Sequence, residues 1–189
     1  DLDIGGETRK VLMQAPKNGF FYVLDRTNGQ LISAENYVPV NWADGINRET
    51  GRPNIRSDAY YWKTNKPWVA FPGPFGGHNW HPMSYSKDTG LVYIPAQEIP
   101  AVYQEDKNFK PFPLGVNLAL DMRPMILPDD EETVNAIKST LKGYLLAWDP
   151  IAQKEVWRAP HRGPWNGGVL STAGNLVFQG DVDGVFNAF

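Results

Sequence analysis

The chain has 189 residues, of which 42% are hydrophobic and 13% aromatic, so it is long and apolar enough for a folded domain and not for a disordered segment. Its net charge of −3 comes from interspersed acidic and basic residues, and the lack of a basic stripe argues against a nucleic-acid partner. The sequence has no cysteine, which excludes disulfides and thiolate chemistry, and no apolar run approaches the ~18 residues of a membrane span.

Glycine (18 residues) and proline (16 residues) are frequent, as expected for many short strands joined by turns. Residues 12–24 contain an apolar strand, a polar turn that ends in Asn-Gly and an aromatic strand. Residues 177–189 repeat this pattern without a gap, with Asp-Gly in the turn. Matching positions include a glutamine and a glycine, Gln14 with Gln179 and Gly19 with Gly184. Asn-Gly and Asp-Gly favour tight turns that need a positive φ, so we expect an antiparallel hairpin in each copy.

A related pattern lies at residues 142–157, where a glycine precedes an apolar strand, and an aspartate and a turn precede an outgoing strand. Four short antiparallel strands per repeat are typical of a β-propeller blade. We predict an all-β fold, a partial propeller of about two and a half blades with one helical insertion. Residues 1–189 would form one incomplete domain, with blades at about residues 9–42, at 77–158 with an insertion at 99–142, and an unfinished blade at 167–189. Propellers close with about 4–8 blades, so we expect the other blades upstream and downstream.

Two stretches lack the pattern of blade strands. Residues 43–76 are rich in Gly, Pro, Asn and aromatic residues and are predicted to form a long loop between blades, and residues 99–128 are predicted to be irregular. A helix is predicted at residues 129–143, because acidic residues at its start and lysines at its end complement the helix dipole and Gly143 would end it. We expect this helix to decorate the surface of the insertion.

The three histidines raise the question of a metal site. His78 and His81 supply only two ligands, and neither a cysteine nor a clear carboxylate accompanies them in their loop, so hydrogen bonding is the favoured role. His161 lies in a turn. The sequence has no nucleophile elbow, phosphate loop or dinucleotide-binding fingerprint, so hydrolase, kinase and nucleotide-dependent dehydrogenase functions have no support. We assign no metal ligand and no catalytic base to this chain.

Five residues near the entries to the repeats are candidates for ligand binding: Lys17 in the first hairpin, Asn79 and Trp80 before the second repeat, and Trp165 and Asn166 before the third. Each alone fits an ordinary turn or packing residue. Together they recur at corresponding points, which we interpret as the axial rim of a propeller. An ammonium group, amides and indole rings on one rim suit a large, flat, anionic, redox-active cofactor.

The motifs that contain these residues resemble those of the pyrroloquinoline-quinone-dependent alcohol dehydrogenases, the quinoprotein and quinohaemoprotein type. The similar segments are residues 15–26, which begin Ala-Pro-Lys-Asn-Gly, residues 77–83, which read Gly-His-Asn-Trp-His-Pro-Met, residues 142–150 and residues 163–180. The resemblance covers essentially the whole chain, including the helical insertion. It implies an eight-bladed propeller that holds the quinone and a Ca²⁺ ion on its axis.

The resemblance also implies roles for the candidate residues. Lys17 matches the cation that hydrogen-bonds the quinone oxygens, and a lysine there resembles the broader alcohol and ethanol branch, since methanol-specific relatives place arginine there. Asn79 and Trp80 match a pair that contacts the cofactor, and Trp165 matches a rim tryptophan that faces it. Asn166 is a further candidate beside that tryptophan. The implied reaction is oxidation of primary alcohols to aldehydes.

Other parts of the implied site have no counterpart in this chain. The catalytic aspartate, the Ca²⁺ ligands, the tryptophan under the cofactor ring and a vicinal disulfide would belong to earlier blades. No Cys-x-x-Cys-His motif occurs, so any haem c would lie in a separate domain. Asp25, Asp149 and Asp183 fit turn positions of the repeat better than a catalytic role. We expect the isolated piece to be inactive and, with open strand edges, to aggregate or remain partly unfolded.

For the whole protein, the resemblance implies a periplasmic enzyme that passes electrons to a cytochrome c or a membrane quinone. Two alternatives stay open. A non-catalytic propeller would scaffold protein partners, but it would have no reason to keep the candidate residues together at one rim. A related quinone enzyme would oxidise a polyol or an aldehyde, and the sequence does not decide this because much of the substrate pocket lies outside the chain.

Overall fold

The computed structural model describes residues 1–115 and 117–189, and most of its regular structure is β-strand. The strands are β1 (Leu2–Ile4), β2 (Glu7–Arg9), β3 (Val11–Gln14), β4 (Phe20–Asp25), β5 (Leu31–Asn36), β6 (Ala43–Ile46), β7 (Pro53–Ile55), β8 (Trp68–Ala70), β9 (Ser84–Ser86), β10 (Leu91–Glu98), β11 (Ala101–Tyr103), β12 (Lys142–Asp149), β13 (Lys154–His161), β14 (Val169–Ser171), β15 (Val177–Gly180) and β16 (Phe186–Ala188). The helices are α1 (Tyr61–Thr64) and α2 (Glu131–Thr140), with 3₁₀ turns η1 (Ser57–Ala59) and η2 (Arg123–Met125). The predicted mostly-β fold is confirmed. Neither described α-helix is long and apolar enough to cross a membrane.

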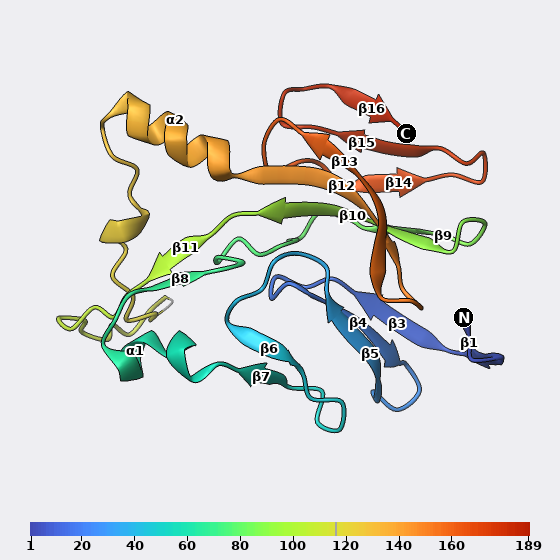
Figure 1. Cartoon of the computed structure of the whole chain (residues 1–189), viewed down its shortest axis with the longest axis horizontal. Coiled ribbons are helices and arrows are strands. Elements are labelled where there is room, and N and C mark those ends of the chain that lie inside the picture. Colours follow the sequence, from blue (N-terminus) through green and yellow to red (C-terminus); the bar gives the residue numbers. More distant parts are fainter. Residues whose placement is uncertain (116) are drawn as a thin grey trace.

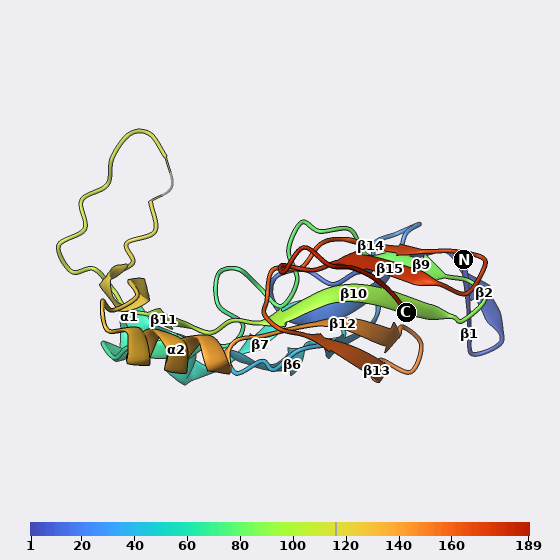
Figure 2. The ribbon, with the colours of Figure 1, turned by 90° about the horizontal axis from the view of Figure 1, so that it is seen from above.

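Three antiparallel sheets form the body of the molecule (Figure 1, Figure 2). The first is β3-β4-β5, the middle sheet is β13-β12-β10-β9, and the third is β14-β15-β16. The strand pairs β1-β2, β6-β7 and β8-β11 lie outside these sheets. The hairpins predicted for the two matching repeats are confirmed, because β3 pairs with β4 and β15 with β16. The number of blades and their boundaries remain predictions.

The middle sheet is buried on both faces, because alternate residues of β10 and β12 pack in opposite directions. One core cluster joins it to the first sheet and includes Val92, Ile94, Ala96, Tyr144, Leu146, Trp148, Phe21 and Val23. A second cluster joins it to the third sheet and consists of Tyr93, Leu145, Ala147, Val169 and Val177. A near-continuous apolar run is the pattern expected for a strand covered on both faces. The apolar residues of the repeat therefore hold three sheets together.

Aspartates close the turns that follow β4 and β12, as the repeat predicted. Asp25 accepts hydrogen bonds from the backbone N–H and the hydroxyl of Thr27 and forms an ion pair with Arg9 at 3.0 Å. Asp149 accepts hydrogen bonds from two backbone N–H groups of its own turn, those of Ile151 and Ala152, both at 2.9 Å. The hydrogen bonds from Thr27, followed by the contact with Arg9, lower the pKa of Asp25 from 3.8 to about 2.

In the third sheet a different aspartate organises the turn. Asp183 lies in the turn between β15 and β16, but its carboxylate faces Arg162 at 3.8 Å. Asp181 instead accepts the backbone N–H groups of Asp183 and Val185 at 3.0 and 2.9 Å. The turn position predicted for Asp183 is correct, and the side chain that caps the turn lies two residues earlier.

The prediction of a long loop at residues 43–76 is wrong. This segment contains the β6-β7 pair, η1, α1 and β8, and β8 pairs with β11 from the stretch predicted to be irregular. Asn41 ties the segment together, since its Nδ2 donates to the Val69 carbonyl at 2.8 Å and its Oδ1 accepts the Phe71 N–H at 2.8 Å. The polar and aromatic residues that suggested a loop instead supply its packing and hydrogen bonds.

The predicted helix is confirmed as α2, and its side chains are largely exposed. Asp130 caps its start by accepting the Thr133 N–H at 2.7 Å, which satisfies one of the free donors of the first turn. The predicted role of Gly143 is wrong, because the helix ends at Thr140 and Gly143 lies in β12. A Cβ atom at Gly143 would lie 2.1 Å from the carbonyl oxygen of Gly163. This glycine is needed for a close backbone approach and not for ending the helix.

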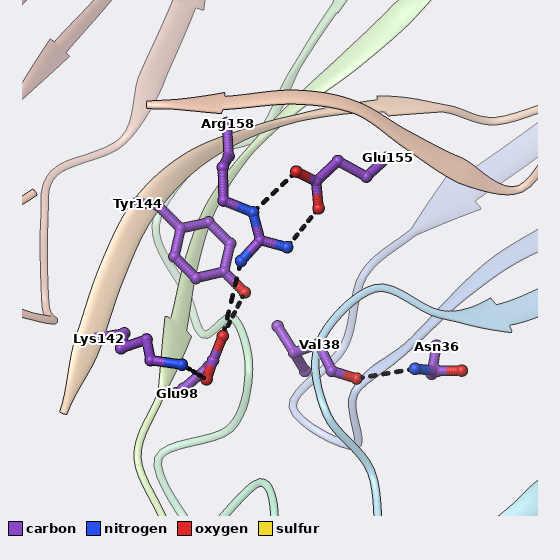
Figure 3. A network of polar contacts seen from close by, with 7 residues as sticks. All are labelled: Asn36, Val38, Glu98, Lys142, Tyr144, Glu155 and Arg158. Carbon is purple, nitrogen blue, oxygen red and sulfur yellow. Dashed lines mark hydrogen bonds and ion pairs between the residues drawn. The ribbon is translucent and has the colours of Figure 1, made fainter. Parts of the chain in front are cut away.

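A buried carboxylate fixes the end of β10 to β12 and β13 (Figure 3). Glu98, which is 8% exposed, accepts hydrogen bonds from Lys142 at 2.9 Å and from the Tyr144 hydroxyl at 3.2 Å. The guanidinium of Arg158 lies 3.7 Å from Glu98, covers the Tyr144 ring at 4.3 Å and also pairs with Glu155. Burial, with the adjacent Glu98 charge, raises the pKa of Tyr144 well above its usual value, so its hydroxyl remains a donor at neutral pH.

We predict that Leu146→Ala loosens the middle sheet. Leu146 is fully buried, and removing such a side chain costs about 2–5 kcal/mol because a cavity remains. Hydrogen–deuterium exchange of residues 142–149 in the full-length protein should accelerate strongly. Leu114→Ala is the matched control, since Leu114 is 85% exposed and should leave exchange unchanged. Equal exchange in both variants would contradict the two-sided core.

Asp25→Asn should make stability less dependent on pH in the acid range. The pKa of Asp25 is depressed in the folded state, so the stability that its charge contributes is present above about pH 4 and is lost as the pH falls towards 2. The free energy of unfolding of the full-length protein is measured by circular dichroism between pH 6 and 2. At pH 6 it should be higher for wild type than for the variant, and this difference should disappear as the pH falls to 2. A difference in the free energy of unfolding that persists unchanged at pH 2 would refute the stabilising role of the Asp25 charge.

Candidate functional site

Three loops meet where β10 ends and β12 begins. We call them the Lys17 loop (residues 15–19, between β3 and β4), the Trp80 loop (residues 75–82, before β9) and the Trp165 loop (residues 163–168, between β13 and β14). Each loop leads into a strand of a different sheet. The stacking of the sheets therefore brings to one end three motifs that are far apart in the sequence.

Gln97, a β10 residue that is 4% exposed, ties the Trp80 loop to the Trp165 loop. Its Nε2 donates to the carbonyl oxygens of Phe75 at 3.3 Å and Gly76 at 3.2 Å, and its Oε1 accepts the backbone N–H of Trp165 at 3.0 Å. Trp165 has a φ of 69°, a left-handed conformation that costs a non-glycine residue about 1–3 kcal/mol. The bond from Gln97 helps to hold Trp165 in this conformation.

His78 ties the Trp80 loop to the Lys17 loop. Its side chain is buried, with Nδ1 2.6 Å from the carbonyl oxygen of Ala15 and Nε2 2.7 Å from that of His81. The backbone N–H of Gly77 also donates to the Lys17 carbonyl at 3.2 Å. Of the two loop histidines, His78 has the predicted hydrogen-bonding role. It connects two loops as well as closing one.

Two glycines allow the Trp80 loop to lie directly against its neighbours. A Cβ atom at Gly76 would be 2.6 Å from the Lys17 Cα, and one at Gly77 would be 2.4 Å from the Val38 side chain. Gly76 also has a φ of 79°, which other residues adopt only with strain. A side chain at Gly76 would therefore separate Lys17 from the Trp80 loop, and one at Gly77 would clash with Val38.

An aromatic surface covers the meeting point of the Trp80 and Trp165 loops. Trp80 is 73% exposed and Trp165 is 38% exposed, and their ring centroids are 6.5 Å apart in an edge-to-face arrangement. Trp80 stacks on His81 at 4.1 Å, and Trp165 meets the edges of His81 and Phe75 at 5.3 Å. Burial, and secondarily the nearby His78, lower the pKa of His81 below its usual value, so its ring is neutral at neutral pH and packs as an aromatic.

The structure brings together the loops that carry the five candidate binding residues, but the side chains of these residues have different roles. Lys17 is exposed beside the Trp80 loop, and Asn79 donates from Nδ2 to the Phe75 carbonyl at 3.0 Å. Asn166 is 5% exposed, and both ends of its amide bond to the backbone, with Nδ2 donating to Gly163 and Oδ1 accepting from Val182. Asn166 thus shapes the Trp165 loop. A cofactor contact by any of the five residues stays a prediction.

The sequence reasoning missed Gln97, although the repeat held a partial signal. Gln179, which matches Gln14 in the repeat, is fully buried. Its Nε2 donates to the Gly167 carbonyl at 2.9 Å, and its Oε1 lies 2.9 Å from the His161 ring. Gln97 in β10 and Gln179 in β15 each lie near the end of the second strand of their sheet. Each glutamine bonds to the loop that precedes the first strand of that sheet. This common role depends on which loops lie nearby, so the residue pattern alone does not reveal it.

The available groups suit a flat anion better than a metal ion. Within residues 1–115 and 117–189, no group of three or more His, Asp or Glu side chains could hold a metal ion. The exposed ammonium of Lys17 and the exposed rings of Trp80 and Trp165 offer positive charge and flat apolar faces on adjoining loops. An anionic aromatic molecule would use both kinds of contact.

We predict that Gln97→Leu releases the Trp80 and Trp165 loops from each other. The change leaves the Trp165 N–H and the Gly76 carbonyl without the Gln97 partner, while the Phe75 carbonyl keeps its bond from Asn79. A lost buried hydrogen bond costs about 1–3 kcal/mol. Hydrogen–deuterium exchange of residues 75–82 and 163–168 in the full-length protein should accelerate. Gln30→Leu, in the exposed turn before β5, is the matched control. Unchanged exchange in both loops of the Gln97 variant would refute the proposed connection.

Several known proteins are similar to this chain over its whole length. No protein-family model matches the chain. The chain is 51% identical over 190 residues to the dehydrogenase subunit of alcohol dehydrogenase (quinone) from Komagataeibacter europaeus, and the match covers 100% of this chain and 26% of that protein. It is 50% identical over 193 residues to quinohemoprotein alcohol dehydrogenase ADH IIB from Pseudomonas putida, with the same coverage.

A solved structure supports the same relationship. The quinohemoprotein alcohol dehydrogenase ADHIIG from Pseudomonas putida HK5 superimposes with a TM-score of 0.93 and 46% sequence identity, covering 100% of this chain and 28% of that one. The chain spans about a quarter of the length of the relatives it matches. Over its whole length, the chain is therefore a homologue of one segment of the quinone-dependent and quinohaemoprotein alcohol dehydrogenases.

Proposed function

We propose that the whole protein is a quinone-dependent alcohol dehydrogenase that oxidises primary alcohols to aldehydes, and that this chain supplies part of the pocket for pyrroloquinoline quinone. The observation that carries the proposal is the meeting of Lys17, Trp80 and Trp165 on loops that Gln97 and His78 connect. The identity of about half of the residues to quinone-dependent alcohol dehydrogenases supports it.

The residues of this chain would bind and polarise the cofactor. When bound, the quinone accepts the two electrons that the alcohol releases. Lys17 would hold its ammonium beside the quinone oxygens, and a donor already in place would stabilise negative charge there without reorganisation. Trp80 and Trp165 supply ring faces, and Asn79 supplies an amide for the cofactor's carbonyl or carboxylate groups.

Further parts of the proposed enzyme lie outside this chain. We infer that Ca²⁺ accompanies the quinone through ligands in other segments, and that electrons pass to a cytochrome c or a membrane quinone. One relative is a quinone alcohol dehydrogenase, which supports a quinone acceptor, and another is a quinohemoprotein, which supports a haem group that would occupy a separate domain here. The resemblance also supports a periplasmic location, which fractionation of the source cells would test.

Lys17→Ala in the full-length protein should lower turnover of ethanol by on the order of 10²-fold, the scale for losing one donor to a developing negative charge. Lys87→Ala is the matched control, because Lys87 lies exposed in the turn between β9 and β10. Quinone binding is measured in parallel by absorbance. Normal turnover in a Lys17 variant that still binds the quinone would refute the assigned role.

The decisive test of the function is dye-linked ethanol oxidation by the full-length protein, before and after reconstitution with pyrroloquinoline quinone and Ca²⁺. Activity only after reconstitution would support the enzyme. Quinone binding without ethanol oxidation would point to a polyol or an aldehyde as substrate. No quinone-dependent change in absorbance would leave the non-catalytic scaffold as the better explanation.

A further inference from the structure

His78 is buried between two loops of the candidate site, and both of its ring nitrogens meet backbone carbonyl oxygens. Nδ1 lies 2.6 Å from the Ala15 carbonyl oxygen in the Lys17 loop, and Nε2 lies 2.7 Å from the His81 carbonyl oxygen in the Trp80 loop. Only 3% of the residue is exposed, so solvent has little access to the ring. The ring therefore has two close polar contacts of the same chemical kind.

A carbonyl oxygen only accepts hydrogen bonds, so each of these two contacts needs an N–H group on the ring. A neutral imidazole carries one N–H, and its other nitrogen would turn a lone pair towards a carbonyl oxygen. A ring with N–H groups at both nitrogens satisfies both contacts and is positively charged. Both distances are shorter than the roughly 2.9 Å typical of neutral N–H donors, as expected when the donor is charged.

Such a charge has no acidic partner in the part of the chain that the structure describes. Within residues 1–115 and 117–189, no carboxylate forms an ion pair with His78. The other titratable side chains of the two loops are Lys17 and His81, and neither can be negative. Tyr37, which packs against Gly77, stays neutral because burial raises its pKa well above the usual value. A buried charge is costly without a counter-charge, so a negative group outside these residues is expected to offset it.

The position of His78 relates this charge to the aromatic surface. The His81 residue that accepts its bond also stacks on Trp80 at 4.1 Å, so a single residue links the His78 ring to the exposed indole. Burial and then the nearby His78 lower the pKa of His81. A positive charge on this pair of histidines would therefore reside on His78, and the neutral ring of His81 would face the surface.

We propose, resting on the proposed function, that His78 is a buried imidazolium that joins the Lys17 and Trp80 loops and supplies a second positive charge for the anionic cofactor. His78 is a positioning residue, because it is buried and acts through the loops and through its electric field. Lys17 offers an exposed charge that a ligand can contact, whereas the charge of His78 is poorly screened by solvent. The bound anion would supply the negative charge that the surroundings of His78 lack.

Nitrogen-15 NMR of the full-length apoprotein at pH 7, labelled at its histidines, tests the charge directly. Both ring nitrogens of His78 should carry a bonded proton and resonate at similar frequencies, which is the signature of an imidazolium. The His78 signal is identified by its loss in His78→Gln or in His78→Lys, so either variant that folds is sufficient. One protonated and one bare ring nitrogen would overturn the proposal. This measurement does not depend on the cofactor.

Titration of the full-length apoprotein with pyrroloquinoline quinone in the presence of Ca²⁺, followed by absorbance, tests what the charge does. His78→Gln removes the charge and should weaken quinone binding about tenfold, which is equivalent to about 1.4 kcal/mol. Unit charges roughly 12 Å apart interact on this scale at an effective dielectric constant of about 20. His78→Lys keeps a cation with N–H donors and should bind the quinone more tightly than His78→Gln. Lys87→Gln is the matched control, because it removes a positive charge from an exposed turn and should bind like wild type.

The outcomes separate the two proposals. Quinone binding by His78→Gln that matches wild type would overturn the role of His78 and leave the proposed function unaffected. Equal weakening in His78→Gln and His78→Lys would do the same, because the loss would then come from the loop contacts and not from the charge. A wild-type protein that binds no quinone would refute the proposed function and this inference with it.

Discussion

The two-sided burial of β10 and β12 is the constraint on which the rest of this structure depends. Tyr144, Leu146 and Trp148 pack towards the first sheet, and Leu145 and Ala147 pack towards the third. A slip of one residue would exchange the two sets of side chains, so the register of the middle sheet is strongly determined. The ends of its strands, and the loops that meet there, are consequently fixed in space.

At that end, hydrogen bonds from buried polar side chains hold the three loops in fixed positions. Gln97 and His78 use their side chains to hold backbone groups of neighbouring loops. Losing such a hydrogen bond in a buried setting is costly, because each unpaired group would keep its full desolvation penalty. Gly76 contributes by allowing the Trp80 loop to lie directly against the Lys17 loop. Trp80 is exposed on a loop that these contacts hold in place.

The two regions on either side of Lys17 have different chemistry. On one side, exposed indole rings adjoin the Trp80 and Trp165 loops and suit a flat anionic cofactor. On the other, a pocket with aromatic walls offers few polar partners. Lys17 is exposed between them. Exposed indole rings and the aromatic-walled pocket therefore lie in separate regions next to Lys17.

The sequence by itself determined the β-rich fold, the hairpins, helix α2 and the positions of the loops, because turn residues, caps and apolar runs act over a few neighbouring residues. It also named Lys17, Trp80 and Trp165 as candidate binding residues, and their contact with a cofactor stays a prediction. It did not reveal the folded segment at residues 43–76, the close approach at Gly143 or the connecting role of Gln97. Those features depend on partners distant in sequence: 68 residues separate Gln97 from Trp165, and 63 separate His78 from Ala15. Only the stacking of the sheets brings such pairs within hydrogen-bonding distance, so the tertiary structure alone decided how the site is held together.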